Sequence, residues 1–415
     1  MHLPTLNFVY NPTVVRVFQD LLKEDGASMP EGTPPTVLVV GGGAAGRACA
    51  QELRRSRLAG SIQIVDAEPG GPIDRTLLDK ALLPGLLTRE QIALPPIEEV
   101  AVTAGEAMAA DFDTRTVELC DGRRLTADAV VIASGAVPRS LNGISVPSHV
   151  RLHRLHTADD VEALQESIPQ AVGRRVAVIG AGFSGTELAS HYVAAGAEVV
   201  LVGRSVLPLE AALGTEISPR LAALLRERTD LRLGTTVQAI ASCGARARLS
   251  LSDGSSVEVD AVIVAHGSVP ATAWTGSPEG IRVDDRLRTG ERGWYAAGSA
   301  AYMVSDGMRL TTDHWNAAIA QGEHAARTIL HDFLGAEDPG PYRPTTGFNL
   351  RAFGSTISVR GLRSPSGSER AAVWPTEPAH PNAMLTEFVD AHGVVTGVAG
   401  FNAGPALAQA ASSIV

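Results

Sequence analysis

Two stretches decide the fold: residues 36–46 read TVLVVGGGAAG, and residues 175–185 read RVAVIGAGFSG. In each stretch a short run rich in β-branched residues leads into a glycine-rich loop, and a helix-like segment follows. A second short apolar run, SIQIVDAE (61–68) or AEVVLVGR (197–204), comes after each helix. Strand, glycine loop, helix and strand in this order form the dinucleotide-binding unit of a doubly wound sheet. The sequence therefore predicts two such units.

The first loop carries glycines with the spacing that dinucleotide binding requires. Gly41 permits a tight turn, Gly43 lets the backbone approach a pyrophosphate, and Gly46 lets helix and strand pack closely. Glu68 follows Gly46 by 22 residues, where a carboxylate accepts hydrogen bonds from ribose hydroxyls. Asp66 is the competing acid, although it stands earlier in the second strand.

The second loop has the same glycines but lacks the acid. Gly180, Gly182 and Gly185 again lie between a strand and a helix, whereas the following strand ends in Gly203 and Arg204. The missing carboxylate removes a charge that repels a 2′-phosphate, and a guanidinium can bind that phosphate. We therefore expect NADPH rather than NADH at this unit. The alternative is that Arg204 is a solvated loop charge.

Composition indicates a globular chain of several domains. Its 415 residues exceed one typical core, and the net charge of −10 is spread along the chain without a nucleic-acid-binding signature. No apolar run approaches the ~20 residues that cross a bilayer, and the start has no secretory pattern. Cys49, Cys120 and Cys243 form neither a redox pair nor a zinc motif. We expect a cytoplasmic protein, monomeric or homodimeric, with no metal site.

Beyond the glycine loops, five segments together resemble the pyridine nucleotide–disulfide oxidoreductase superfamily. Within it the resemblance is to the ferredoxin reductase type, which includes rubredoxin and putidaredoxin reductases and apoptosis-inducing factor, and it covers roughly residues 36–400. The segments are EPGGPIDRTLLDKALL (68–83), LTADAVVIASGAVPR (125–139), GAGFSGTELA (180–189), WYAAGSAA (294–301) and TTDHWNAAIAQG (311–322). They are similar to the family's acid-x-PYxRPPLSK, ATGxxPR, GGGFIGLEVA, YAxGD and RxExWxxAxxQG motifs.

The resemblance implies an α/β fold with two nested Rossmann-like domains that bind FAD and NAD(P)H, plus a C-terminal α+β domain. The FAD-binding domain is expected to consist of two separate segments, 36–147 and 271–335. The NAD(P)H-binding domain (148–270) would lie between them, with an N-terminal extension and linker (1–35) before them and the C-terminal domain (336–415) after them. Asn11 would cap a short helix in the extension.

The resemblance also implies the site residues. Lys80 would lie near the reactive nitrogen of the flavin, paired with Glu187, and Trp315 would cover part of the nicotinamide–flavin region. Arg75 would lie beside the flavin ring with Lys80. The other expected cofactor-binding residues are Gly41, Gly43, Ala44, Ala45, Gly46, Glu68, Ala133, Ser134, Gly135, Arg139, Gly180, Gly182, Phe183, Ser184, Gly185, Arg204, Gly267, Gly298, Ser299 and His314.

Several positions depart from the family's motifs, and all lie in segments expected around the flavin. Ser299 replaces an aspartate that hydrogen-bonds the ribityl chain, so FAD is expected to be held less tightly. Asp79 stands where the family has a serine before the lysine, and Thr311 and Asp313 replace an arginine and a glutamate. These differences indicate a divergent member.

The absence of a cysteine pair requires electrons to leave the flavin directly. Our first hypothesis is transfer from NAD(P)H through FAD to a ferredoxin-like one-electron acceptor. Residues 343–370 hold five arginines against one acid, Glu369, and a cationic face would attract an acidic ferredoxin. Scattered, solvated arginines are the alternative. The competing functions are a flavin-dependent oxidase or tailoring enzyme acting on a small molecule, and a non-catalytic flavoprotein. The arginines are Arg343, Arg351, Arg360, Arg363 and Arg370.

Overall fold

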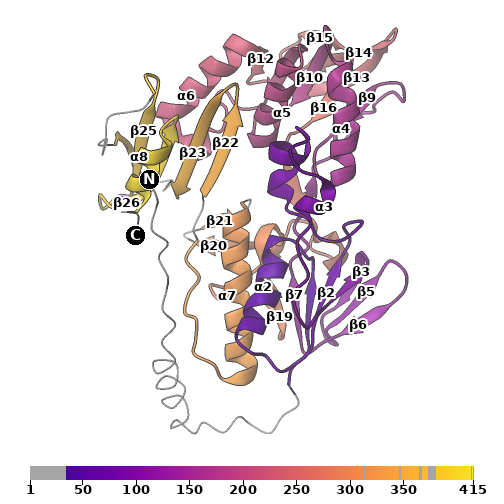
Figure 1. Cartoon of the computed structure of the whole chain (residues 1–415), viewed down its shortest axis with the longest axis vertical. Coiled ribbons are helices and arrows are strands. Elements are labelled where there is room, and N and C mark those ends of the chain that lie inside the picture. The colour runs from indigo at the N-terminus through magenta and orange to yellow at the C-terminus, as the bar shows by residue number, and fades with distance from the viewer. Residues whose placement is uncertain are drawn as a thin grey trace, which may run out of the picture.

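Two open parallel sheets and one antiparallel sheet form the frame of the molecule, as the computed structural model shows (Figure 1). The structure describes residues 34–305, 307–312, 314–344, 347–363, 367–372, 380–412 and 414. The helix expected from Asn11 lies outside these residues. The sheets confirm the α/β fold class with two Rossmann-type units.

The first parallel sheet grows from the first glycine-loop segment. All four residues of its central strand are nearly inaccessible, because a parallel sheet is covered on both faces. Its strands are, in order across the sheet, β19 (Trp294–Ala296), β7 (Ala129–Ile132), β1 (Val37–Val40), β2 (Ile62–Asp66) and β3 (Val100–Ala104). Two helices far apart in sequence, α2 (Ala44–Arg55) and α7 (Trp315–Leu334), lie side by side against it (Figure 1). This sheet thus combines early and late segments of the chain.

The second parallel sheet repeats the pattern. Its strands are, in order, β12 (Asp230–Leu233), β11 (Glu198–Gly203), β10 (Arg175–Ile179), β16 (Ala261–Val264) and β9 (Arg151–His153). Its helices are α4 (Ala158–Gln170), α5 (Phe183–Ala194) and α6 (Glu210–Arg228). Gly214, with φ +77°, interrupts α6. The side chain of Glu369 accepts a hydrogen bond from the N–H of Thr215 at 2.8 Å, so it caps the stretch of that helix after the interruption.

A third, antiparallel sheet lies near the C-terminus and packs beside the second unit (Figure 1). Its strands are, in order, β22 (Gly347–Ala352), β23 (Ser355–Gly361), β26 (Val395–Phe401), β25 (Met384–Val389) and β24 (Ser368–Ala371), and α8 (Gly404–Ala411) follows. Leu350, Ile357 and Phe401 of this sheet share one buried cluster with α5 and α6. Strand β22 is thereby held against α5. The domain boundaries themselves stay a prediction.

Smaller elements complete the chain. Two three-stranded antiparallel ribbons extend from the parallel sheets, a two-stranded ribbon joins the two units, and a further three-stranded sheet has one parallel and one antiparallel pair. The strands are β4 (Ala107–Asp111), β5 (Thr116–Leu119), β6 (Arg124–Thr126), β13 (Val237–Cys243), β14 (Arg246–Leu251), β15 (Ser256–Val259), β8 (Ala136–Pro138), β17 (Ser268–Pro270), β18 (Ile281–Arg282), β20 (Ala301–Ser305) and β21 (Met308–Thr311). The short helices are η1 (Arg75–Leu77), η2 (Leu78–Leu82), α3 (Arg89–Ile92), η3 (Ala273–Thr275) and η4 (Gly298–Ala300).

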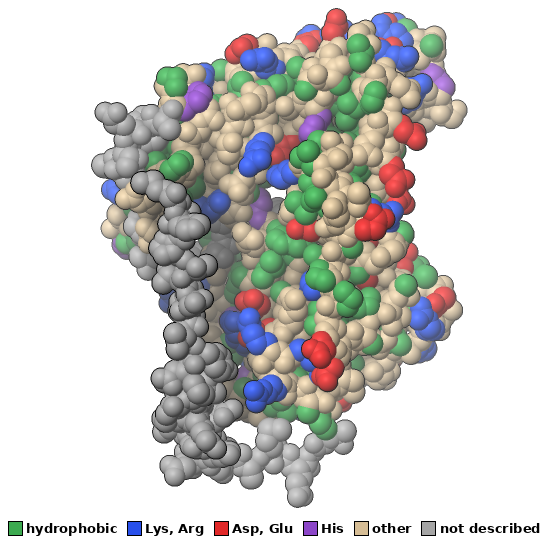
Figure 2. Space-filling view, in the orientation of Figure 1, with side chains coloured by type: hydrophobic (Ala, Val, Ile, Leu, Met, Phe, Trp, Pro, Cys, Tyr) green, Lys and Arg blue, Asp and Glu red, His purple; other side chains and the backbone are tan. Residues whose placement is uncertain are grey.

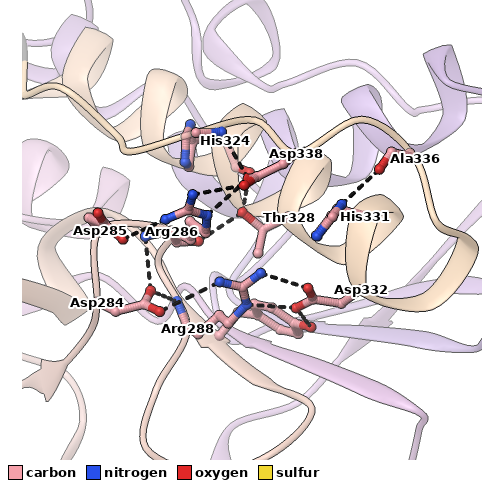
Figure 3. A network of polar contacts seen from close by, with 12 residues as sticks. Asp284, Asp285, Arg286, Arg288, His324, Thr328, His331, Asp332, Ala336 and Asp338 are labelled. Atoms are coloured by element: carbon pink, nitrogen blue, oxygen red, sulfur yellow. Dashed lines mark hydrogen bonds and ion pairs between the residues drawn. The ribbon is translucent and has the colours of Figure 1, made fainter.

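A network of ion pairs fastens the end of α7 to the loop before β19 (Figure 3). The guanidinium of Arg286 donates to both carboxylate oxygens of Asp338, at 2.9 and 2.8 Å. Arg288 does the same with Asp332, at 2.8 and 2.7 Å, and the hydroxyl of Tyr295 also donates to Asp332. Each of these charged side chains has a partner within the network. The network therefore holds the late segments of the chain onto the first sheet.

Candidate active site

The first glycine loop joins β1 to α2 and leaves the start of that helix open. Gly41 has φ +109°, and a side chain there would clash with the carbonyl oxygen of Ala133. A Cβ on Gly46 would clash with the carbonyl oxygen of Gly41, which explains why helix and strand pack closely only with glycine. A Cβ on Gly43 would meet nothing within 4 Å. The helix start therefore has free space beside it, as anion binding at a helix N-terminus requires.

Asp66, the last residue of β2, and Glu68, which follows that strand, have different partners. Asp66 accepts hydrogen bonds from the N–H groups of Gly42 at 2.6 Å and Glu68 at 3.0 Å, so it holds the loop. Glu68 is buried; its Oε2 accepts from Arg75 at 2.8 Å, while its Oε1 has no hydrogen-bond partner. A buried acceptor without a donor is costly. A ribose hydroxyl would satisfy it, so the chemistry of this place fits the dinucleotide predicted from the sequence.

Late segments of the chain complete the surroundings of this loop. A Cβ on Gly298 would lie 2.9 Å from the Cβ of Ala45, and one on Gly322 would clash with the Ala45 carbonyl oxygen. The buried amide of Gln321 accepts from the N–H of Gly298 at 2.7 Å and donates to Thr312 at 2.6 Å. Motifs from both ends of the chain thus meet at Ala45. Ser299, which follows Gly298, is partly exposed in η4.

Lys80 and Glu187, 107 residues apart, are in contact. The Nζ atom of Lys80 lies 3.2 Å from Oε2 of Glu187 and 3.1 Å from Oδ2 of Asp79. The side chains of Glu187 and Asp79 are 7% and 10% exposed, whereas that of Lys80 is 35% exposed. Strand β22 also contacts Glu187, because the N–H of Arg351 donates to Oε1 of Glu187 at 3.0 Å. The Arg75 side chain pairs with Glu68 and not with these groups, so its place beside a flavin ring stays a prediction.

Burial and mutual contact shift the titration of all three groups. Burial, and then the hydrogen bond with Asp79, raise the pKa of Glu187 well above its ordinary value. Burial opposes ionisation of Asp79, but Glu187 and the Lys80 ammonium together hold its pKa below the ordinary value. Burial would lower the pKa of Lys80, but the two carboxylates raise it. The site therefore holds a charged lysine between one ionised carboxylate and one that favours its protonated form.

An aromatic cluster stands where α5, α7 and β22 converge. The ring of Phe183 lies 4.4 Å from that of Phe348 and 5.5 Å from that of His314, and His314 stacks on Phe348 at 5.1 Å. Trp315 is the first residue of α7, next to His314, and is half-buried. Figure 2 shows basic, acidic and histidine side chains distributed over both the upper and the lower part of this view, among tan and apolar surface.

The second glycine loop repeats the geometry of the first without its acids. Gly180 has φ +115°, and a side chain there would clash with the Ala265 carbonyl oxygen; Gly182 precedes α5 with free space beside it. Strand pairing places Val65 beside Val40 and Val202 beside Ile179, so Gly203 occupies the position of Asp66. By the same register Ser205 corresponds to Glu68. Arg204, between them, is exposed, as is Ser205. Ser184 is exposed and Gly185 buried at the start of α5.

The expected residues of the crossover between the units hold the linking ribbon. Ser134 donates its hydroxyl to the carbonyl of Ala271 at 2.7 Å, and Gly135 has φ +72°. The backbone N–H of Arg139 donates to the carbonyl of Gly267 at 2.9 Å, and its guanidinium to Ser268 at 3.3 Å. These contacts position the two units; contact of these residues with a nucleotide stays a prediction.

Two features of the site were beyond the sequence. Asp79 differs from the family's motif, but the sequence did not indicate that its carboxylate contacts Lys80. No local sequence pattern indicated that the backbone of β22 contacts Glu187. Three of the five arginines of the expected cationic face have partners. Arg363 pairs with Glu369 at 2.9 Å, Arg370 pairs with Glu387 at 2.7 Å, and Arg360 donates to main-chain carbonyls. These three arginines are thus engaged within the sheet.

Other chemistries find no support among the residues that the structure describes. The three cysteines are free and apart, and burial raises the pKa of the Cys49 thiol to about 12. Within the described ranges, no cluster of three or more histidine, cysteine or acidic side chains could hold a metal ion. Among the same residues, no helix has the length and apolar character needed to cross a membrane.

Comparison with known proteins agrees with this geometry. The model of the family described as pyridine nucleotide-disulphide oxidoreductase matches residues 35–322. The rhodocoxin reductase of Rhodococcus erythropolis is 34% identical over 343 residues, which span 79% of this chain and 78% of that protein. The ferredoxin–NAD(+) reductase component of the p-cumate 2,3-dioxygenase system of Pseudomonas putida is 28% identical over 350 residues, 81% of this chain and 85% of that one. A crystallised ferredoxin reductase from Rhodopseudomonas palustris is 25% identical, with a TM-score of 0.78 over 88% of this chain and 91% of that one.

Proposed function

The chain belongs to the pyridine nucleotide-disulphide oxidoreductase family, and from this premise we propose that it passes electrons from NADPH through FAD to a ferredoxin-type acceptor. The protein is an FAD-dependent oxidoreductase that uses a nicotinamide nucleotide. The finer elements of the proposal are the acceptor, the preference for NADPH and the roles of individual residues.

The contact between Lys80 and Glu187 carries the proposal. Lys80 follows the first dinucleotide unit, and Glu187 stands on the helix that begins at the second glycine loop. Their 3.2 Å contact therefore marks where the reactive ends of two dinucleotides, one bound to each unit, would meet. A flavin bound there would supply the chemistry that links a two-electron hydride donor to a one-electron acceptor. The ammonium of Lys80 would stabilise negative charge on the ring, and Glu187 would orient that ammonium.

The remaining roles follow from the loops. We assign the adenosine half of FAD to Gly41, Gly43 and Glu68, because Glu68 has an unpaired buried oxygen and the helix start is open. The rest of the FAD would extend past Gly298 and Ser299 toward Lys80. The nicotinamide nucleotide would lie on the second loop, with Phe183 and Trp315 covering the ring.

The acceptor follows from the cysteines. Cys49 is buried, and the other two cysteines lie on separate ribbons, so this chain has no dithiol to take electrons from a flavin. Direct transfer to a one-electron carrier remains, and relatives named as ferredoxin reductases support it. The free cysteines agree with a reducing compartment, and we propose a cytoplasmic location. A monomer or a homodimer stays our expectation.

An anaerobic titration with acceptor tests the function. FAD-loaded protein is bleached with NADPH, and a ferredoxin or cytochrome c is then added while the flavin absorbance is followed. We expect rapid bleaching and rapid return of the colour with stoichiometric reduction of the ferredoxin. Return of colour with oxygen or a small quinone alone would instead assign an oxidase, and absence of bleaching would assign a non-catalytic flavoprotein.

A further inference from the structure

The lysine of the site faces two carboxylates where the resembling family's motif provides one. The Nζ atom of Lys80 lies 3.1 and 3.2 Å from the two oxygens of Asp79, and 3.2 Å from Oε2 of Glu187. A serine in place of Asp79 would leave a simple ion pair. The second acid is therefore a property of this chain that the ordinary pairing of lysine and glutamate does not require.

Charge and burial limit how this cluster can be ionised. With both carboxylates ionised the cluster carries a net charge of about −1, because a single ammonium faces two acids. The two acids are almost fully buried, at 10% and 7% exposed. Two carboxylates that share a buried place do not both ionise readily, and one proton held between them removes the excess charge. Oδ2 of Asp79 and Oε2 of Glu187 lie 3.1 and 3.2 Å from the same Nζ atom, so the two carboxylates border one place where a proton can be held.

Within the part of the chain that the structure describes, no second cation contacts the pair. From α5, His191 places Nε2 3.1 Å from the Asp79 carbonyl oxygen, and burial lowers the pKa of that histidine, which keeps it neutral. From β22, Arg351 contributes its peptide N–H to Glu187, while the residue itself is exposed. On η2 the only charged neighbours are Asp79 and Lys80. Among the described residues, Lys80 is thus the one cation in contact with the two acids.

We propose that Asp79 turns the Lys80–Glu187 ion pair into a proton-holding site: at low pH Asp79 and Glu187 share one proton against Lys80, and at a pH where the pair has lost this proton it takes the proton back when the flavin beside it is reduced. This inference rests on the proposed function, since it places a flavin at Lys80. Charge added to the ring favours the protonated pair, because a nearby negative charge raises the pKa of a carboxyl group. Protonation of one carboxylate takes one proton from water and changes no oxidation state, so both electrons stay with the flavin.

The first test reads the proton directly in oxidised, FAD-loaded protein. Infrared spectra recorded from about pH 5 to about pH 10 follow the carbonyl band of protonated carboxyl groups. We expect wild-type protein to lose one such band far above the ordinary range of glutamate. Glu187→Gln and Asp79→Ser should lack this transition, and Asp79→Asn, which keeps the side-chain volume, replaces the serine variant if that one does not fold. Asp159→Asn, which removes an exposed acid on α4, is the matched control and should keep the transition.

The second test measures proton uptake without nucleotide or ferredoxin. The flavin is photoreduced in weakly buffered solution above the pH of the infrared transition, with a pH indicator present. Wild-type protein should take up about one proton more per flavin than Asp79→Ser, because the protons exchanged by the ring and by the electron donor are common to both proteins. A transition that survives in Asp79→Ser, or equal uptake in the two proteins, would overturn the inference. Failure of NADPH to bleach the flavin would overturn the proposed function instead and leave both of these results readable.

Discussion

We propose that the choice between NADPH and NADH depends on three consecutive residues that begin with the last residue of β11. In the first unit the corresponding positions hold Asp66, Ala67 and Glu68; in the second they hold Gly203, Arg204 and Ser205. Both acids are therefore gone, and an exposed guanidinium stands between the two replaced positions. We predict that Arg204→Gln weakens NADPH binding and leaves NADH binding nearly unchanged.

The structure sets the size of the effect. Hydrogen bonds to charged groups contribute about 1.5–3 kcal/mol, and because Arg204 is exposed the lower end applies, which corresponds to about tenfold in affinity. The reverse change, Ser205→Glu, restores an acid at the position of Glu68. It should lower the affinity for NADPH by about tenfold or more through repulsion of the 2′-phosphate, while NADH use is kept or improved. A side chain at Gly203 would clash with Leu233, so that position is unsuitable for the acid.

The assay is steady-state reduction of cytochrome c or ferricyanide at varied NADPH and NADH, with kcat/KM compared between the two nucleotides. Arg226→Gln on α6 removes another exposed arginine and serves as the matched control, with an unchanged ratio expected. The NADPH preference of Arg204→Gln should also become less sensitive to salt, because a screened charge contact is gone. A ratio of kcat/KM values that is the same in Arg204→Gln and wild type would refute the role of this arginine.

Three further changes test the loops and the centre. Gly180→Ala places a side chain on a residue with left-handed backbone, where it would clash with a carbonyl oxygen. Calorimetry should then detect no NADPH binding, and urea unfolding should show about 2–4 kcal/mol less stability. Normal NADPH binding would contradict this. Lys80→Met removes the cation from two buried acids, which raises the pKa of Glu187 further. The folded form of the Lys80→Met variant then depends on a protonated Glu187. The free energy of unfolding of this variant in urea should therefore fall more steeply than that of wild type as pH rises from about 6 to about 9. Parallel pH profiles of the two proteins would exclude this. Gln321→Met leaves the N–H of Gly298 unpaired beside the first loop and should weaken FAD binding about tenfold in fluorescence titrations, whereas unchanged affinity would contradict its placing.

Local sequence predicted the fold well because the decisive signals are local. Runs such as Val37–Val40 are buried on both faces, and the first and third glycines of each loop motif have the positive φ or close contacts that exclude other residues. The central strands of both parallel sheets were expected where they occur.

The site was harder to predict because it joins elements that are distant in sequence. The nearness of Lys80 and Glu187 came from a family resemblance; spacing alone gives no reason for residues 107 positions apart to meet. The ion pair of Arg75 with Glu68 and the contact of β22 with Glu187 depend on how loops and sheets pack against one another. Such packing produces no periodic pattern in the sequence. Charge counting for residues 343–370 could not show which arginines have partners, since Arg370 pairs with Glu387 and Arg360 donates to main-chain carbonyls.

The most direct measurement of the central claim is stopped-flow mixing of FAD-loaded protein with NADPH in the absence of oxygen, followed by a second mixing with ferredoxin. The account predicts that flavin absorbance falls in the first step and returns in the second, with two ferredoxin molecules reduced for each NADPH consumed. A flavin that NADPH does not reduce, or a reduced flavin that returns its electrons to oxygen but not to ferredoxin, would contradict it.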